Sequence, residues 1–184
     1  MPFNLNLLIL FLTHMASTQT TPLSETEIER YVQWVDQLKV EHQLDRISYP
    51  NMSGCGGAVD GYYFNQKLVL IESIYNAELG FSSRKYYLEQ DSFVKIIYHE
   101  HFADWDRYQA DYPPDKFDFD ASKMTYTDTL YSIFLAHPAV FYKTAGNHLI
   151  SKNPEQPLLD RLLSCGQEMK NELHEVTDQA DSLK

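Results

Sequence analysis

The chain has 184 residues, a length that suits one compact domain rather than two. Its apolar fraction of 43% and charged fraction of 22% exclude a wholly disordered, collagen-like or coiled-coil protein. The 15 Lys and Arg against 26 Asp and Glu give a net charge of -11, so we expect nucleic acid and anionic membrane surfaces to be repelled. The 13 Tyr and 10 Phe favour a body rich in β-structure.

The first 24 residues carry no Asp, Glu, Lys or Arg, and apolar residues fill positions 7–12. Small polar residues follow, an order typical of a secretory signal peptide. We therefore predict a signal peptide over residues 1–20, a single domain over residues 21–184, and a secreted or periplasmic protein. The alternative is an N-terminal segment that packs on the domain or stays disordered. The apolar run is too short for the roughly 20 residues of a membrane-spanning helix, so no stable span is expected.

Two helices are predicted, one at each end of the domain. Ser24 and Glu27 have the spacing of a capping box, and apolar residues recur at three- and four-residue steps after them. Asn153-Pro154 reads as a cap followed by proline at the first position of the C-terminal helix. Gly166 weakens that helix by about 1 kcal/mol relative to alanine, so we expect a close contact there, with the loop that holds the first cysteine as the candidate.

Short apolar runs broken by polar turns fill the chain between the helices, a pattern of β-hairpins. One hairpin carries Tyr62-Tyr63, a second carries Tyr86-Tyr87 about 24 residues later, and a looser third copy covers residues 141–150. We predict an α+β fold: an antiparallel meander sheet of six or seven strands, with the N-terminal and C-terminal helices packed on one face.

The repeated Tyr-Tyr hairpins over residues 58–151, behind an export signal, resemble those of small uncharacterised secreted bacterial proteins. The resemblance implies an antiparallel sheet and brings no known activity.

The tyrosine pairs are the predicted binding residues. Adjacent residues of a strand point to opposite faces. One ring of each pair should therefore enter the core, and the other should project from the face opposite the two helices. Tyrosine suits such a surface because its ring supplies apolar area and its hydroxyl keeps a hydrogen bond. Tyr62, Tyr63, Tyr86 and Tyr87 are therefore expected to bind a partner. The alternative is that these rings only pack on one another.

The chain has two cysteines, Cys55 in a glycine-rich loop and Cys165 in the C-terminal helix. Two cysteines in an exported chain usually pair, so we predict a Cys55–Cys165 disulfide. The alternative is two separate buried thiols. Neither cysteine has the C-x-x-C spacing of a zinc or redox site.

The sharpest candidate for chemistry is His99-Glu100-His101. On a strand, residues two apart share a face, so the two imidazoles could hold a metal with Asp104 or Asp106 as a third ligand on the turn beyond. The same alternation turns His99 and His101 away from the apolar positions of their strand. We therefore prefer solvent-facing polar residues to a metal site.

Acidic pairs at Asp104-x-Asp106 and Asp118-x-Asp120 suggest a calcium loop, but neither has the glycine and the bidentate Glu of an EF-hand. A solvated loop is the expectation. No G-x-S-x-G, H-E-x-x-H or Walker pattern occurs, and no cofactor is predicted.

The sequence favours a small exported binding or interaction module without catalysis, whose partner is a protein or a small molecule. The alternative function is a metal-assisted hydrolase centred on His99 and His101.

Overall fold

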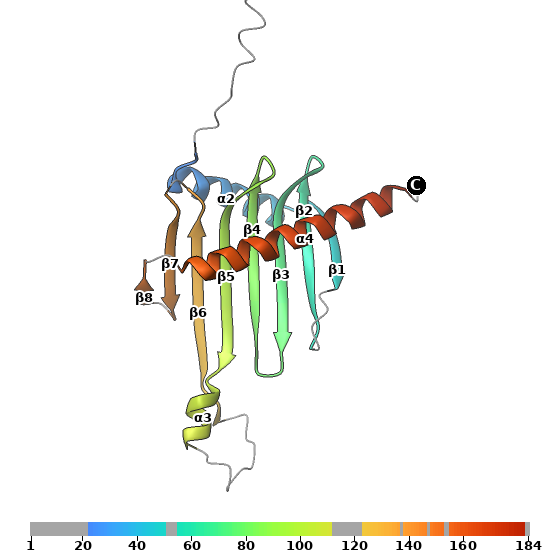
Figure 1. Cartoon of the computed structure of the whole chain (residues 1–184). Coiled ribbons are helices and arrows are strands. Elements are labelled where there is room, and N and C mark those ends of the chain that lie inside the picture. The colour runs from blue at the N-terminus through green and yellow to red at the C-terminus, as the bar shows by residue number, and fades with distance from the viewer. Residues whose placement is uncertain are drawn as a thin grey trace, which may run out of the picture.

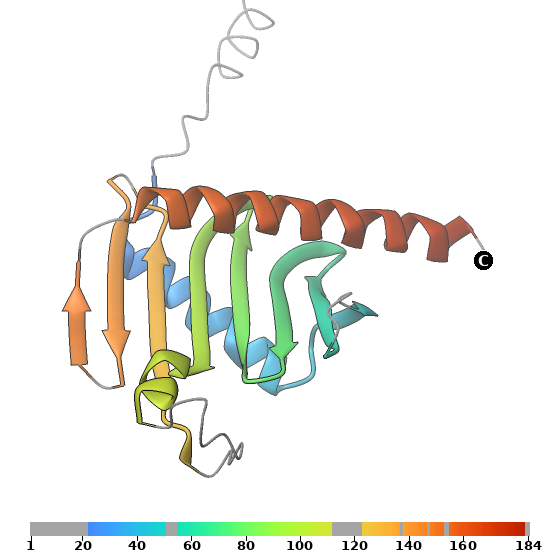
Figure 2. The ribbon, with the colours of Figure 1, turned by 60° about the horizontal axis from the view of Figure 1, so that its bottom comes forward.

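The computed structural model describes residues 22–50, 55–111, 123–136, 138–146, 148–152 and 155–182. They form an eight-stranded antiparallel sheet, whose strands follow one another from edge to edge in chain order, with a long helix on each face (Figures 1 and 2). The predicted signal peptide lies outside the described residues. The strands are β1 (Asp45–Pro50), β2 (Gly57–Phe64), β3 (Lys67–Ala77), β4 (Gly80–Glu89), β5 (Ser92–Ala103), β6 (Tyr126–Phe134), β7 (Val140–Ala145) and β8 (His148–Ser151). The helices are α2 (Glu25–Val40), α3 (Trp105–Asp111) and α4 (Gln156–Ser182).

An antiparallel meander with a helix at each end is confirmed, but the predicted count of six or seven strands is wrong. The additional strand is β1, which ends at Pro50 just before the glycine-rich loop of Cys55 and lies outside the predicted hairpins. Because β1 is an edge strand and Pro50 is its last residue, the missing amide donor interrupts no central ladder.

Helix α2 begins with the predicted capping box. The Ser24 hydroxyl accepts the Glu27 amide at 3.3 Å, and the Glu27 carboxylate accepts the Ser24 amide at 2.8 Å. The helix ends at Val40, and its buried residues recur at helical spacing on the side that faces the sheet. These residues are Ile28, Val32, Val35 and Leu38.

Tight turns connect the first two hairpins. Asn65 and Gln66 have φ values of 50° and 65°, and Gln90 and Asp91 have φ values of 47° and 69°. Two consecutive residues with positive φ define the type I′ turn, whose twist matches that of antiparallel strands. The turns place β2–β3 and β4–β5 as two hairpins of the same design, side by side in the sheet.

The two helices cover opposite faces of the sheet, so the prediction that both pack on one face is wrong (Figure 2). Helix α2 packs in a cluster with Tyr62, Leu70 and Tyr87, whereas α4 packs in a cluster with Tyr63 and Tyr86. Neighbouring residues alternate between faces, and both sets are apolar. The central strands are thus apolar on both faces, and each face needs its own cover.

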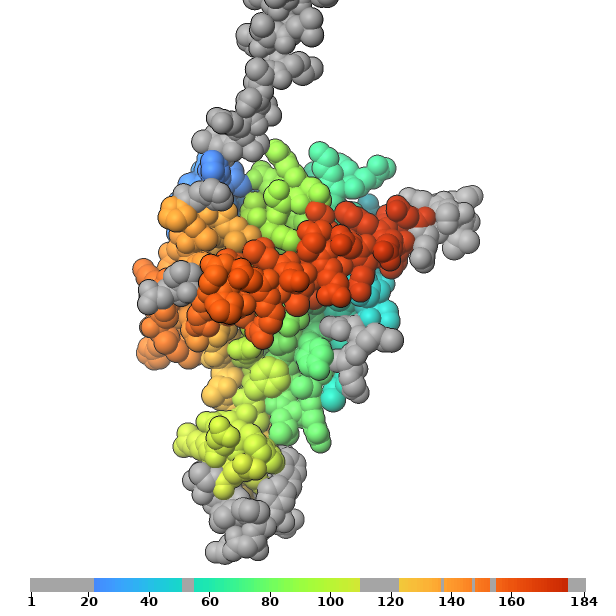
Figure 3. Space-filling view, in the orientation of Figure 1, coloured from blue at the N-terminus to red at the C-terminus, as the bar shows by residue number. Residues whose placement is uncertain are grey.

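Helix α4 crosses one face of the sheet (Figure 3), and two glycines show that it packs very close to it. A Cβ atom added to Gly166 would lie 2.7 Å from Cε1 of Tyr86, and one added to Gly61 on β2 would lie 2.8 Å from Cδ1 of Leu173. The close contact expected at Gly166 therefore exists, but its partner is the ring of Tyr86 and not the Cys55 loop. Both glycines are explained by the short distance between the backbone and the opposing side chains.

The two helices differ in how much of the sheet they cover. Helix α4 has 27 residues and runs obliquely across the sheet to the side of β1 (Figure 1). Helix α2 has 16 residues, and its cluster takes in only the ends of the strands near the two tight turns, including Val69 and Val94. No helix among the described residues covers the other half of the α2 side. We call this half the open face, and it comprises the outward side chains of Ile74, Phe81, His99, His101, Tyr126, Asp128, Leu130 and Leu149 with the polar ladder described below.

Candidate functional site

A cleft opens at the turn end of the sheet, between the tips of the two tight hairpins and between the two helices. We call it the hairpin cleft. Its volume is about 790 Å³, within the usual range of about 300–1,000 Å³ for small-molecule sites. Helix α2 contributes Tyr31 and Trp34, and α4 contributes residues of its C-terminal half. The hairpins supply Tyr63, Phe64, Gln66, Lys67, Leu68, Val69, Leu88, Glu89, Gln90 and Asp91, and α4 supplies His174, Thr177 and Asp178.

The cleft exists because β3 and β4 separate before they end. The two strands pair from Ala77↔Gly80 to Leu70↔Tyr87. Beyond these pairs, residues 67–69 of β3 and residues 88–89 of β4 are not paired with each other. Each hairpin also has a register irregularity shortly before its tight turn, between Tyr62 and Tyr63 in the first hairpin and between Tyr87 and Leu88 in the second. Bulges bend a strand and increase its twist. We attribute the divergence of the two tips to these matching bulges.

The floor of the cleft is apolar and buried. Leu68, Val69 and Leu88 form it, and all three are side chains of the interior. Above them stands an aromatic wall: the ring of Trp34 lies 5.5 Å from that of Tyr31 and packs edge-on against Phe64 at 5.3 Å. Trp34 is 41% exposed although it belongs to this wall. A large indole that is held in place and still open to solvent suits contact with an apolar ligand.

A hydrogen bond from α2 satisfies a backbone carbonyl at the point where β3 and β4 diverge. The Tyr31 hydroxyl donates to the Leu88 carbonyl oxygen, which has no strand partner toward β3. Burial raises the pKa of Tyr31 to about 12, and the nearby Glu89 carboxylate contributes in the same direction. Tyr31 therefore stays a neutral donor at all physiological pH values. The wall is held in a defined position before any ligand arrives.

The rim of the cleft is polar. Asp91 pairs with Lys170 of α4, with 2.7 Å between Oδ1 and Nζ, and the same Nζ donates to the Asp91 carbonyl at 2.9 Å. On the opposite side the Tyr63 hydroxyl lies 3.4 Å from Oγ1 of Thr177. The first pair of contacts ties the β4–β5 hairpin to α4, and the second contact ties the β2–β3 hairpin to it. The apolar floor thus has a fixed, polar border.

The four predicted tyrosines are all buried, and they do not form an exposed aromatic row. One ring of each pair does point to each face, but helices cover both faces at this level. Tyr87 donates to Oδ1 of Asp36 on α2 at 3.0 Å, and the buried Tyr86 hydroxyl has no hydrogen-bond partner among the described residues. Tyr63 alone of the four lines the hairpin cleft.

The predicted disulfide is absent, because Cys55 and Cys165 are both free thiols. Cys165 lies near the ring of Tyr86, which is level with Gly61 across the sheet. Gly57, two residues after Cys55, lies four residues along β2 from Gly61, which corresponds to about 13 Å. Disulfides need Cα atoms within about 7 Å, and the free state of both thiols agrees with this separation along the sheet.

The two histidines do come together, but around a different carboxylate from the one expected. His99 Nε2 and His101 Nδ1 each lie 2.9 Å from Oδ1 of Asp128, on the neighbouring strand β6. Asp104 instead accepts the Arg107 amide at 3.1 Å, at the start of α3. Throughout the part of the chain that the structure describes, no group of three or more His, Cys, Asp or Glu side chains is arranged to hold a metal ion.

The acidic pair Asp118-x-Asp120 lies outside the described residues.

Aromatic rings enclose the histidines: His101 stacks on Tyr126 at 4.9 Å and on Phe81 at 5.3 Å, and Phe81 also meets His99 edge-on at 5.4 Å. The two histidines are thus partly exposed members of an aromatic cluster on the open face.

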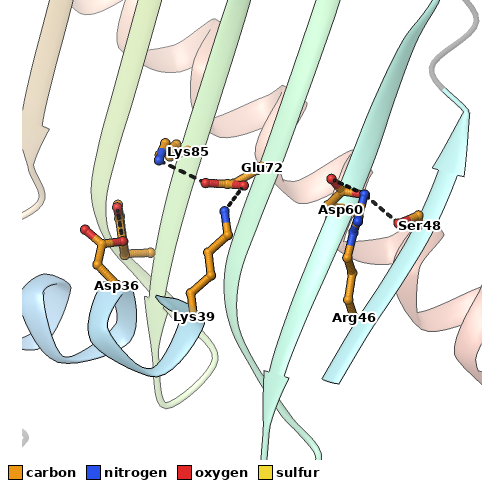
Figure 4. A network of polar contacts seen from close by, with 8 residues as sticks. Asp36, Lys39, Arg46, Ser48, Asp60, Glu72 and Lys85 are labelled. Carbon is orange, nitrogen blue, oxygen red and sulfur yellow. Dashed lines mark hydrogen bonds and ion pairs between the residues drawn. The ribbon is translucent and has the colours of Figure 1, made fainter. Parts of the chain in front are cut away.

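A row of charged side chains lies on the sheet beside α2 (Figure 4). We call this row the polar ladder, and it consists of Lys39, Arg46, Asp60, Glu72 and Lys85. Glu72 on β3 lies between Lys39 of α2 and Lys85 of β4, with 2.9 Å to Lys85. Asp60 on β2 accepts two hydrogen bonds from Arg46, at 2.9 and 3.0 Å. Burial alone would raise the pKa of Glu72, but the hydrogen bonds and charges of the two lysines outweigh it and hold that pKa below the usual range. The ladder is therefore charged, and each of its two carboxylates is paired with at least one cationic side chain.

Sequence reasoning missed the cleft, because its walls come from four separate segments of the chain. Trp34 reads as a packing residue beside the apolar stripe of α2, and nothing local shows that a second helix lies across the sheet edge from it. One signal was present: each tyrosine pair is followed within three residues by a two-residue turn, at 65–66 and at 90–91, which marks two hairpins of similar design.

Comparison with known proteins adds no assignment: no family model matches the chain, and neither the curated proteins nor the solved structures contain a match. Among the described helices, none combines the length and the apolar character that crossing a membrane requires.

Proposed function

We propose that this protein is a small binding protein without catalysis of its own, and that the hairpin cleft takes a small, largely apolar ligand. The observation that carries the proposal is the cleft itself, a cavity of about 790 Å³ with a buried apolar floor and an exposed tryptophan in its wall. Sites for small molecules typically combine such a floor with a few fixed polar groups. Here those groups are on the rim.

The fixed geometry of the wall supports the proposal further. Tyr31 is tied to the Leu88 carbonyl and packs on Trp34, and Trp34 packs on Phe64. A ligand would therefore meet side chains that are already ordered, so little conformational entropy is lost on binding. We do not propose the hydrolase, because both imidazoles of its predicted centre face the Asp128 carboxylate and Asp104 caps α3.

We also propose that the protein is exported, on the strength of the uncharged first 24 residues and their apolar run. The intact mass of protein isolated from its native source tests this. A mature chain that lacks about 20 N-terminal residues is expected, and a chain that still begins at Met1 would contradict export by a cleaved signal.

Titration with the neutral apolar dye N-phenyl-1-naphthylamine tests the cleft. We expect binding with a dissociation constant on the order of micromolar, and transfer of excitation from Trp34 to the dye in a Trp105→Phe variant, which leaves Trp34 as the sole tryptophan. Thr177→Trp fills the cleft from α4 and should weaken dye binding at least about tenfold, equal to about 1.4 kcal/mol.

The matched control is Ser164→Trp, the same substitution at an exposed position of the same helix. This variant should bind the dye like the wild-type protein. Equal affinity in the two tryptophan variants would refute the cleft as the site. Failure of the wild-type protein to bind the dye would refute the apolar ligand class.

A further inference from the structure

The open face carries an unusual share of exposed apolar surface. Leu130 is 40% exposed, Leu149 is 52% exposed, and Tyr126 is exposed as well. Leu130 and Leu149 both lie level with Thr144, so β6, β7 and β8 present a continuous strip on one side of the sheet. Ile74 lies on the same side on β3, beyond the polar ladder. Contiguous exposed apolar surface on a soluble domain marks an interaction site.

The charges on this face cancel, unlike those of the whole chain. Three basic side chains, from the two lysines around Glu72 and from Arg46, stand against the carboxylates of Asp60, Glu72 and Asp128. The two histidines add no charge in their neutral form. The whole chain has a net charge of -11. Two copies of an acidic protein repel each other through most of their surfaces, but not through a neutral one.

We propose that the open face is a self-association surface, on which a second copy of this chain packs face to face. The surface is apolar at its centre and is bordered by internally paired charges, so it is complementary to itself and offers no net field to a strongly charged partner. Two sheets that pack in this way lie about 10 Å apart with interdigitated side chains. The contact buries Leu130 and Tyr126 and leaves the hairpin cleft, at the other end of the strands, open.

The aromatic cluster gives this interface its rigid part. His101 is held between the rings of Phe81 and Tyr126, and Asp128 fixes both imidazoles from the neighbouring strand. Side chains that are already ordered lose little entropy when they are buried, which favours an interface at their position. Rigid aromatic residues of this kind are enriched at the centres of interfaces.

Sedimentation velocity over a concentration range from about 5 to about 500 µM tests the proposal by mass action. The full mature chain should pass from monomer to dimer within this range. Leu130→Lys combined with Leu149→Lys places four lysines in the contact and should raise the dissociation constant at least about 100-fold. The control is Val40→Lys, which makes the same kind of change at an exposed residue outside the open face and should leave dimerisation unchanged.

Two further measurements keep the outcome decisive. The double variant must retain the wild-type melting temperature at low concentration and its affinity for the dye, which shows that it is folded. In a Cys55→Ser, Cys165→Ser background, Thr144→Cys should give a disulfide-linked dimer on mild oxidation. A wild-type protein that stays monomeric at every concentration would overturn the proposal, as would a dimer unaffected by the double variant. Binding of the monomer to neutral phosphatidylcholine vesicles through Leu130 would assign the face to a lipid surface instead.

Discussion

The two faces of the sheet differ in what covers them, although the same strands form both. On one face α4 runs obliquely over the sheet, and on the other the shorter α2 covers only the turn end. Each tyrosine pair supplies one ring to each face, so strand alternation gives both faces the same kind of aromatic packing. What differs is helix length and position. This difference leaves one half-face open, whereas the cleft forms at the end where both helices are present.

The largest expected effect tests whether the two faces unfold together. Leu162→Ala removes a buried side chain under α4, and Ile28→Ala removes one of similar size under α2. Each should lower the free energy of unfolding by about 2–5 kcal/mol, from lost transfer energy and the cavity left behind. Urea denaturation followed by circular dichroism measures both. A single coincident transition is expected for each variant, and a separate early melting of α2 would show that the faces are independent.

A second prediction concerns the close approach of α4 to the sheet. Gly166→Val inserts a branched side chain where a Cβ atom would already lie 2.7 Å from the Tyr86 ring, so we expect a loss of about 3 kcal/mol from overpacking. Thermal unfolding measures this loss. Ser164→Val, at an exposed site two residues earlier, should change the stability by no more than about 0.5 kcal/mol. Equal stability of the two variants would contradict the close packing.

A third prediction uses the polar ladder on the α2 side. The pKa of Glu72 is lowered in the folded protein, so its ionised form contributes stability above the unfolded pKa of about 4.5, and this contribution disappears as the pH falls through the folded pKa. Glu72→Gln should cost about 1–2 kcal/mol at pH 7, and the difference from the wild-type protein should narrow as the pH falls below the unfolded pKa of about 4.5.

Urea denaturation at several pH values measures this difference. Glu175→Gln, an exposed substitution on α4, is the control and should give a small difference at every pH. A Glu72→Gln variant that is as stable as the wild-type protein at pH 7 would show that the ladder does not help to hold α2.

A fourth prediction concerns the start of α2. Ser24→Ala removes the acceptor of the Glu27 amide and half of the capping box, and it should cost about 1 kcal/mol. The melting temperature measures the effect, with Thr26→Ala at an exposed position of the same turn as the control. A loss in the control as large as that in Ser24→Ala would mean that local helix propensity, and not the cap, is being measured.

The smallest effect is expected on the open face. Leu130→Lys exchanges a side chain that is 40% exposed, and in dilute solution, where the chain is monomeric, it should change the stability by no more than about 0.5 kcal/mol. Thermal unfolding in dilute solution measures this. A loss like that of Leu162→Ala would show that Leu130 belongs to the core.

Features built from neighbouring residues could be predicted from the sequence. The capping box of Ser24 and Glu27 depends on residues three apart, and the hairpins around Tyr62-Tyr63 and Tyr86-Tyr87 depend on a period of two. Strand β1 was missed because its proline is tolerated only at an edge, and whether a strand lies at an edge is a property of the whole sheet.

Local sequence thus determined the helices, the hairpins and the alternation of each tyrosine pair, because backbone dihedrals and side-chain period act over a few residues. Tertiary structure alone decided which face each helix covers, since strand alternation is symmetric with respect to the two faces. It also decided that Cys55 and Cys165 stay unpaired, and that His99 meets Asp128, 29 residues further along the chain. The hairpin cleft was also decided by tertiary structure, because it exists only where two hairpins diverge between two helices. No single segment of the chain determines that position.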